Sequence, residues 1–219
     1  MFGLIFDMDG VLVDSTRAHF QSWCLLAEEL GQQVTEEAFI QTFGRQNRDI
    51  VPLFFGYDDQ ETVQKLGDRK EELYRDIIRQ HVPANDGAVE LVRSCHQAGF
   101  KLAIGSSGPP QNIDLVLKGM RIGPYFDVRI TSKQCTRGKP DPQVFSLAIE
   151  GLGIPAHHCA VVEDAPSGIQ AALAAGAAAI ALAGNHPPQA LAAANLIVNS
   201  LRELSPDKLK RLIAQKSGD

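Results

Sequence analysis

The sequence predicts an α/β fold: a Rossmann-like doubly wound parallel sheet, with an all-helical segment inserted after the first strand. A short apolar run at residues 4–6 has the length of a buried strand. Residues 15–81 then show helical periodicity only, and from residue 82 onward strand-like and helix-like stretches alternate. Such alternation builds a parallel sheet with helices on both faces, so we assign the first strand to the same sheet as the later ones. We therefore expect a core domain from residues 1–14 plus 82–219 and a helical domain from residues 15–81.

The inserted segment is typical of a small helical bundle. Ser15 or Thr16 suits the N-cap of its first helix, and Gly31 suits the end of that helix. Pro52 falls inside the third helix and weakens that assignment. We expect four helices: the first covers residues 17–30, the second starts at residue 35, and the third and fourth cover residues 47–55 and 59–80.

After a break at residues 83–87, the alternating part supplies the rest of the sheet. Its apolar runs have strand length, and each is followed by a helix-like stretch. The expected strands are 101–106, 128–131, 159–163, 178–182 and 196–198. The first expected helix of this part ends near residue 98, and the others cover residues 111–118, 143–150, 167–175 and 207–215.

Composition restricts the partners and the compartment. The chain has 219 residues, 44% of them hydrophobic, which is enough for a sizeable core. A formal net charge of −5 argues against a nucleic acid as the main partner. The four cysteines lie far apart, form no C-x-x-C pair and are typical of reduced thiols in a cytosolic protein. Neither a signal peptide nor a membrane span is indicated, so we expect a cytoplasmic protein without a membrane partner. A monomer is the default expectation for a chain whose inserted helical segment has to move.

Two acids directly follow the first strand. Asp7 and Asp9 are spaced so that both side chains can leave an extended chain on the same side, and Gly10 allows a sharp turn after them. Two carboxylates held together require a cation, or one of them keeps its proton. One interpretation is a strand followed by an acidic turn. The other is a nucleophile and a proton donor beside a hard metal ion.

Three later strand ends carry matching groups. Ser106 and Ser107 lie between glycines, where a hydroxyl and backbone N–H groups suit a phosphate oxygen. Lys139 lies on a stiff loop before a helix, and Glu163-Asp164 follows the next strand. Each alone could be a turn, a cap or a surface charge. Because ligands bind at the carboxyl ends of parallel strands, the four together predict a phosphate site with Mg²⁺, which prefers carboxylate and water oxygens.

These residues give the chain a resemblance to the haloacid dehalogenase superfamily of phosphotransferases, in the branch with a helical cap after the first strand. The resemblance is carried by Asp7-Met8-Asp9-Gly10-Val11, Ser106, Lys139-Pro140 and Glu163-Asp164. It implies that Asp7 is the nucleophile that forms an aspartyl-phosphate. Asp9 would protonate the leaving oxygen and then activate water. The resemblance also implies that Ser106 and Lys139 hold the phosphoryl group, and that Mg²⁺ is bound by Asp7, the backbone carbonyl of Asp9, Asp164, and Glu163 directly or through water.

The helical segment bears on the choice between a phosphatase and a mutase. His19 and Trp23 fall where mutases of the β-phosphoglucomutase type place a histidine and a tryptophan, although Trp23 is typical of a core residue. Lys70 and Arg48, or Arg45 in its place, fall near positions where those mutases hold a second phosphate or couple cap closure to catalysis.

The loop after the second core strand argues against a mutase. Residues 106–110 lack the lysine–asparagine element that follows the motif serine in those mutases. We therefore expect hydrolysis of a small phosphomonoester, with a sugar-phosphate mutase as the alternative and a non-catalytic phosphate-binding protein as a third hypothesis. The sequence does not rank sugar phosphates, phosphoglycolate or nucleotides as substrates.

Overall fold

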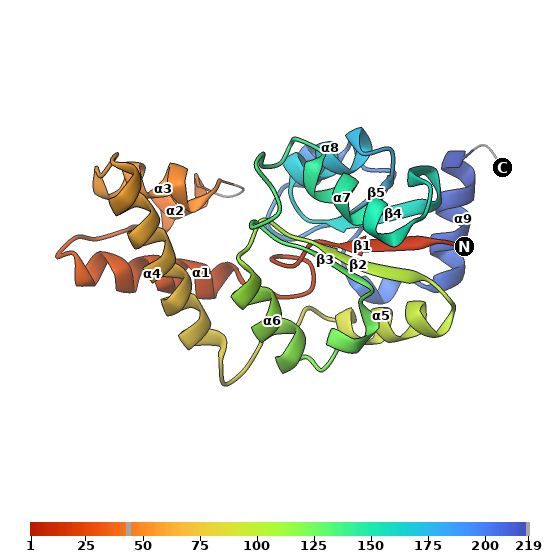
Figure 1. The fold of residues 1–219 in the computed structure, drawn as a ribbon, viewed down its shortest axis with the longest axis horizontal. Helices are drawn as coiled ribbons and strands as arrows, with labels where there is room; N and C mark the ends of the chain where they lie inside the picture. The colour runs from red at the N-terminus through yellow and green to blue at the C-terminus, as the bar shows by residue number, and fades with distance from the viewer. Residues whose placement is uncertain (43–44, 218–219) are drawn as a thin grey trace. The chain divides into compact units, whose positions relative to one another are not determined.

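The computed structural model describes residues 1–42 and 45–217 and confirms the predicted fold class (Figure 1). Its centre is a six-stranded sheet in which every neighbouring pair of strands is parallel, in the order β3-β2-β1-β4-β5-β6. The strands are β1 (Gly3–Phe6), β2 (Lys101–Gly105), β3 (Val128–Ile130), β4 (Cys159–Glu163), β5 (Ala178–Leu182) and β6 (Leu196–Val198).

The strand order reverses direction between β1 and β4. From β1 the chain proceeds outward through β2 to β3, and it then returns to the other side of β1 to form β4, β5 and β6. The connections that leave β1 and β4 therefore run to opposite sides, and in sheets of this kind ligands bind at the carboxyl ends of such a strand pair. Phe6 pairs with Val162, so the residues that follow β1 and β4 emerge next to each other.

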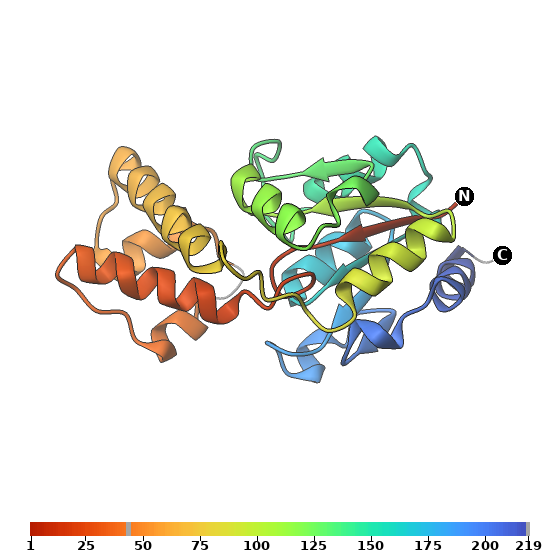
Figure 2. The ribbon, with the colours of Figure 1, turned by 90° about the horizontal axis from the view of Figure 1, so that it is seen from below.

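Helices cover both faces of the sheet. The core helices are α5 (Ala88–Gln97), α6 (Pro110–Gly119), α7 (Gln143–Leu152), α8 (Pro166–Ala174) and α9 (Pro206–Ser217). Helices α7 and α8 lie on one face (Figure 1), where Phe145 and Ile169 pack with Ile5 and Val161 of the central strands. Helix α5, yellow-green in Figure 2, crosses the opposite face. Residues 4–6 of β1 are completely buried, as expected for a strand covered on both sides.

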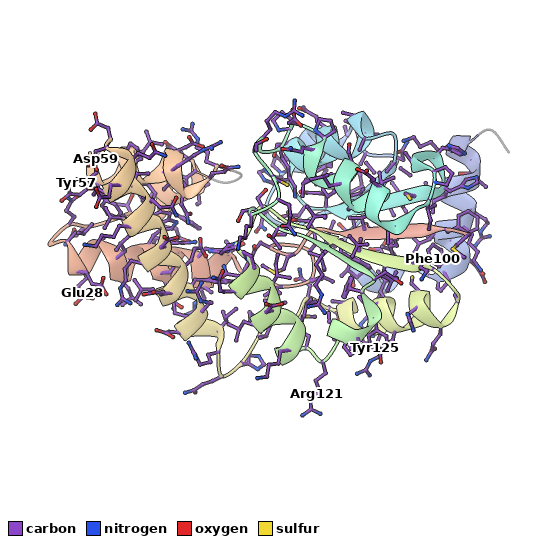
Figure 3. The ribbon with its side chains drawn as sticks, in the orientation of Figure 1. Glu28, Tyr57, Asp59, Phe100, Arg121 and Tyr125 are labelled. Atoms are coloured by element: carbon purple, nitrogen blue, oxygen red, sulfur yellow. The ribbon has the colours of Figure 1, made fainter. Side chains whose placement is uncertain are left out.

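Residues 15–82 form a second compact unit, apart from the unit of residues 1–14 and 83–219. Its helices are α1 (Thr16–Glu29), α2 (Glu36–Ile40), α3 (Asn47–Phe55) and α4 (Gln60–Ile78). Trp23, Phe39 and Val51 lie in its apolar interior. Asp59, labelled in Figure 3, caps α4, because its Oδ1 accepts a hydrogen bond from the Thr62 N–H at 2.9 Å. We refer to this unit as the helical cap.

Most predicted helices and strands start and end within one or two residues of the observed ones. Pro52 lies inside α3, which nevertheless continues to Phe55 because Ile50, Val51 and Phe55 are buried in the cap interior. Four short 3₁₀ helices in the described residues were not predicted from the sequence: Gly123–Tyr125, Ala156–His158, Pro188–Leu191 and Leu201–Glu203. No helix in the described part of the chain is long and apolar enough to cross a membrane.

Candidate active site

Asp7 is held rigidly at the end of β1. Its backbone N–H donates to the Val162 carbonyl at 3.0 Å, which extends the pairing of β1 with β4 by one residue, and its side chain is only 10% exposed. Gly10 then turns the chain with a φ of +78°, a conformation that glycine adopts without strain. The turn is tied to the start of the second core segment, where the Asn85 side-chain amide donates to the carbonyls of Gly10 and Val11, both at 2.9 Å.

Lys139 bridges the carboxylates that follow β1 and β4. Its Nζ lies 2.9 Å from Asp7 Oδ1 and 2.6 Å from Glu163 Oε1, and the lysine side chain is 9% exposed. The loop that carries Lys139 is itself braced, because Gln143 Oε1 accepts hydrogen bonds from the N–H groups of Thr136 and Arg137 at 2.9 and 2.8 Å. A buried cation is thus fixed against Asp7.

The site has more negative charge than Lys139 compensates. Burial raises the pKa of Asp7 to about 7, with Lys139 acting in the opposite direction. Burial and the neighbouring Glu163 likewise raise the pKa of Asp164 well above its usual value. Burial disfavours the ammonium of Lys139, yet Asp7 and Glu163 outweigh it and raise the lysine pKa. A divalent cation would stabilise both carboxylates in their charged form.

The arrangement of these oxygens fits such a cation. Asp7, Glu163 and Asp164 each offer a carboxylate oxygen, and the three oxygens lie within 4.8 Å of one another. Mg²⁺ takes one or two carboxylates and keeps water in its other positions, which suits this set. Asp164 Oδ2 also accepts from the Asn185 side-chain amide at 3.0 Å, which orients that carboxylate.

Glu163 differs from the other two acids because both of its oxygens are already engaged. Oε1 accepts from Lys139 Nζ at 2.6 Å and Oε2 accepts from the Ala165 N–H at 2.6 Å. Its proximity to Asp7 and Asp164 allows it to assist a metal ion, but its hydrogen bonds favour a role in holding Lys139. Its predicted part in metal binding, direct or through water, stays a prediction.

Two glycines leave room for the acids after β4. A Cβ on Gly10 would lie 2.1 Å from Asp164 Oδ2, and a Cβ on Gly168 would lie 1.8 Å from Glu163 Oε1. Both distances are far below van der Waals contact, so any side chain at either position would displace a carboxylate of the site.

The loop after β2 lies beside Asp9. Ser106 is 1% exposed and its Oγ accepts from the Gly108 N–H at 3.0 Å. A Cβ on Gly108 would lie 3.7 Å from Asp9 Oδ2, which places that carboxylate next to the loop. Ser107, in contrast, is exposed. Since β2 pairs with β1, the predicted residues Asp7, Asp9 and Ser106 lie at the ends of neighbouring strands.

The predicted cap residues belong to the other unit and are described within it. His19 on α1 and Lys70 on α4 are in direct contact, with Lys70 Nζ 2.7 Å from His19 Nδ1. Arg45 and Arg48 are exposed. Trp23 is 1% exposed, which confirms that it is a core residue. Substrate binding by His19, Lys70 and Arg48 stays a prediction.

Several residues that support the site were missed by the sequence analysis. They are Asn85, Gln143 and Asn185, whose side chains support the site by hydrogen bonds to groups in other segments. No local sequence motif indicates these contacts. The sequence did offer an indication for Gly168, because this glycine follows Glu163-Asp164 at short spacing, near the start of α8. Its spacing gave no indication that Glu163 packs against it.

Comparison with known proteins agrees with this geometry. Residues 3–176 match the family described as haloacid dehalogenase-like hydrolase. The chain is 29% identical over 177 residues to the phosphorylated carbohydrates phosphatase of Thermotoga maritima, covering 80% of this chain and 82% of the relative. It is also 27% identical over 217 residues to the β-phosphoglucomutase of Bacillus subtilis, covering 95% of this chain and 94% of the relative.

A solved structure supports the fold. The crystal structure of β-phosphoglucomutase from Clostridium difficile superposes with a TM-score of 0.88 over 100% of both chains, at 21% sequence identity. At that identity the match shows the fold alone. The relatives and the family match agree with the predicted enzyme class, a phosphatase with phosphoglucomutase relatives. The chain belongs to the haloacid dehalogenase-like hydrolase family.

Proposed function

We propose that this enzyme hydrolyses a small phosphorylated sugar or a similar phosphomonoester, with Mg²⁺ at the end of the sheet and Asp7 as the nucleophile. The observation that carries the proposal is the buried contact of Asp7 with Lys139, at 2.9 Å, inside a group of carboxylates suited to a metal ion. The bound ion would balance charge on the phosphoryl oxygens and keep the buried carboxylates ionised. Asp7 and Asp164 are the residues best placed to hold it.

In the first step, Asp7 attacks phosphorus. A bond forms between a carboxylate oxygen of Asp7 and phosphorus, the ester P–O bond breaks, and the leaving oxygen takes a proton from Asp9. Lys139 and the loop at Ser106 hold phosphoryl oxygens during this transfer. Glu163 keeps the lysine in place, since it accepts from Lys139 Nζ at 2.6 Å.

In the second step, water releases the phosphate. The Asp9 carboxylate takes a proton from water, the water oxygen bonds to phosphorus, and the bond to Asp7 breaks. The products are the alcohol and inorganic phosphate, and both aspartates return to their starting states. Because Asp9 gives a proton in the first step and takes one in the second, its role requires a leaving group that needs protonation.

Support for a sugar phosphate comes from the relatives, among which is a phosphatase of phosphorylated carbohydrates. A sugar-phosphate mutase is the second candidate, favoured by the β-phosphoglucomutase relative. The loop after β2 favours hydrolysis, because residues 106–110 offer no cationic side chain to hold a second phosphate.

A paired assay tests the choice. The full chain is given β-glucose 1-phosphate and Mg²⁺, primed with glucose 1,6-bisphosphate, and inorganic phosphate and glucose 6-phosphate are measured together. Hydrolysis predicts free phosphate, which a panel of sugar phosphates would then extend. Glucose 6-phosphate that accumulates without free phosphate would overturn hydrolysis and establish the mutase. The Asp7→Asn variant is the control for both activities.

A further inference from the structure

The helical cap contains a buried charge pair that the proposed mechanism does not use. Lys70 and Glu71 on α4 are both buried, and their side chains are 3% and 11% exposed. Lys70 Nζ lies 2.9 Å from Glu71 Oε1, and the same oxygen accepts from the Asn47 side-chain amide at 2.8 Å. Removing an ion pair from water is costly, so a pair kept in the interior of a small helical unit calls for a role.

Two aromatic rings and a carboxylate surround Lys70 Nζ. Its Nζ lies 5.4 Å from the centre of the Trp23 ring and 5.6 Å from that of the Tyr74 ring, both within the range in which an aromatic face attracts a cation. The carboxylate of Glu71 accepts a hydrogen bond from Lys70 Nζ. Burial alone would raise the pKa of Glu71, but Lys70 is the largest of the neighbouring influences that lower it to about 2, so Glu71 is ionised at neutral pH.

A charged Lys70 determines which nitrogen of His19 carries the proton. An ammonium group has three donors and no acceptor. Its 2.7 Å contact with His19 Nδ1 therefore makes Nδ1 the acceptor, and a neutral imidazole that accepts at Nδ1 carries its proton at Nε2. The ring plane is fixed as well, because His19 stacks on Tyr74 at a centroid distance of 4.1 Å and an angle of 5°.

We propose that Glu71, with Asn47, is a positioning residue that holds the Lys70 side chain against His19 Nδ1 and thereby fixes His19 as the Nε2–H tautomer, a hydrogen-bond donor. The order of hydrogen bonds is Asn47 to Glu71, Lys70 to Glu71, and Lys70 to His19. This rests on the proposed function for its purpose: a donor of fixed tautomer suits a phosphate or sugar oxygen, which accepts hydrogen bonds. Glu71 and Asn47 lie outside the four motifs that carry the family resemblance.

The primary test is the tautomer of His19 in the full chain without substrate. Long-range ¹H–¹⁵N NMR of histidine-labelled protein at neutral pH distinguishes the two ring nitrogens, and the His19→Gln variant assigns the signal among the six histidines. The wild-type protein is expected to show Nδ1 unprotonated and Nε2 protonated. A proton on Nδ1 would overturn the proposal without the need for any variant.

Two variants test the part played by Glu71. Glu71→Gln removes the charge and keeps the shape, so the single tautomer is expected to give way to a mixture, and kcat/KM for the best sugar phosphate is expected to fall at least about tenfold. Glu72→Gln is the matched control, since Glu72 is the next residue on α4, is exposed and pairs with Arg69. Lys70→Met is expected to change the tautomer in the same way as Glu71→Gln.

The outcomes separate this proposal from the proposed function. A wild-type tautomer in Glu71→Gln and Lys70→Met would overturn the positioning role whatever the activity. A wild-type protein without phosphatase activity would contradict the proposed function and would leave the NMR test valid. If Glu71→Gln fails to fold, a wild-type tautomer in Lys70→Met would still overturn the proposal, because the proposal makes Lys70 the group that fixes His19.

Discussion

Replacing Glu163 by glutamine tests whether Glu163 holds Lys139, and the size of the effect follows from the contacts. Both Glu163 oxygens accept hydrogen bonds, from Lys139 Nζ and from the Ala165 N–H, each at 2.6 Å. Glutamine has one oxygen and one NH₂ group, so whichever way it turns it presents a donor to one of these two donors. The substitution therefore removes a charge and breaks at least one buried hydrogen bond, while leaving the volume unchanged.

Breaking a buried ion pair by removing one partner costs about 3–5 kcal/mol, and Asp7 remains beside Lys139 to compensate in part. Removing the Glu163 charge also relieves its repulsion of Asp164, so we expect a smaller loss, about 2 kcal/mol, in the free energy of unfolding without metal. For a chain of this length that corresponds to a decrease of about 4–8 °C in Tm. Because Lys139 loses one of its two anchors, kcat is expected to fall about a hundredfold, as for a misplaced catalytic group.

The assay is thermal and urea unfolding in the presence of a chelator, together with phosphatase kinetics in Mg²⁺. Glu150→Gln, the same substitution on the exposed side of α7, is the control and should be close to wild type in both. Wild-type stability and kcat in Glu163→Gln would refute the reasoning that Glu163 holds the lysine.

Three further predictions follow from the same geometry. Asp9→Ala should release about one equivalent of nitrophenol from an aryl phosphate and then stall, whereas alkyl phosphates should react about 10²–10⁴-fold more slowly than with wild type; steady turnover of an alkyl phosphate would contradict the role of Asp9. Since burial raises the pKa of Asp7 to about 7, a proton competes with Mg²⁺ below that pH. Calorimetry should therefore show Mg²⁺ affinity falling about tenfold per pH unit below 7 with proton release on binding, and equal affinity at pH 6 and 8 would disprove this. Burial raises the pKa of Glu71, but Lys70 outweighs it and lowers that pKa to about 2. The ionised Glu71 therefore contributes its full stabilisation of the fold above its unfolded-state pKa near 4.5, and this contribution is lost as the pH falls toward 2. Urea unfolding should show that this acid-dependent loss, about 3 kcal/mol, is absent in Glu71→Gln, and parallel pH profiles of the two proteins would contradict it.

The sequence predicted the part of the site that depends on strand ends. Asp7, Ser106 and Glu163 lie far apart in the chain, yet each lies at the carboxyl end of a short apolar strand, and these ends meet at one edge of a parallel sheet. The alternation of strand-like and helix-like stretches was enough to predict the fold class and most helix and strand bounds, because such alternation builds a parallel sheet with helices on both faces. The sheet order was not needed to expect that these residues meet.

The supporting contacts could not be predicted, because they depend on side-chain conformations and on loops packed in three dimensions. Asn185 reaches Asp164 from the loop after β5, and nothing in its local sequence indicates this. Both oxygens of Glu163 are engaged by groups from different segments, which spacing alone does not show. The contact of Lys70 with His19 joins α1 to α4, and the helical periodicity of either helix gives no indication that a lysine is buried there.

The central claim is that Asp7 becomes covalently bonded to phosphorus, and trapping that bond tests it most directly. The wild-type enzyme is mixed with a rapidly hydrolysed sugar phosphate and Mg²⁺ and quenched within one turnover. Borohydride then reduces an aspartyl-phosphate to homoserine, which peptide mass spectrometry locates. The account predicts homoserine at position 7, and none when substrate is omitted or in Asp7→Asn. An unmodified Asp7 during continuing turnover, or homoserine at another aspartate, would contradict it.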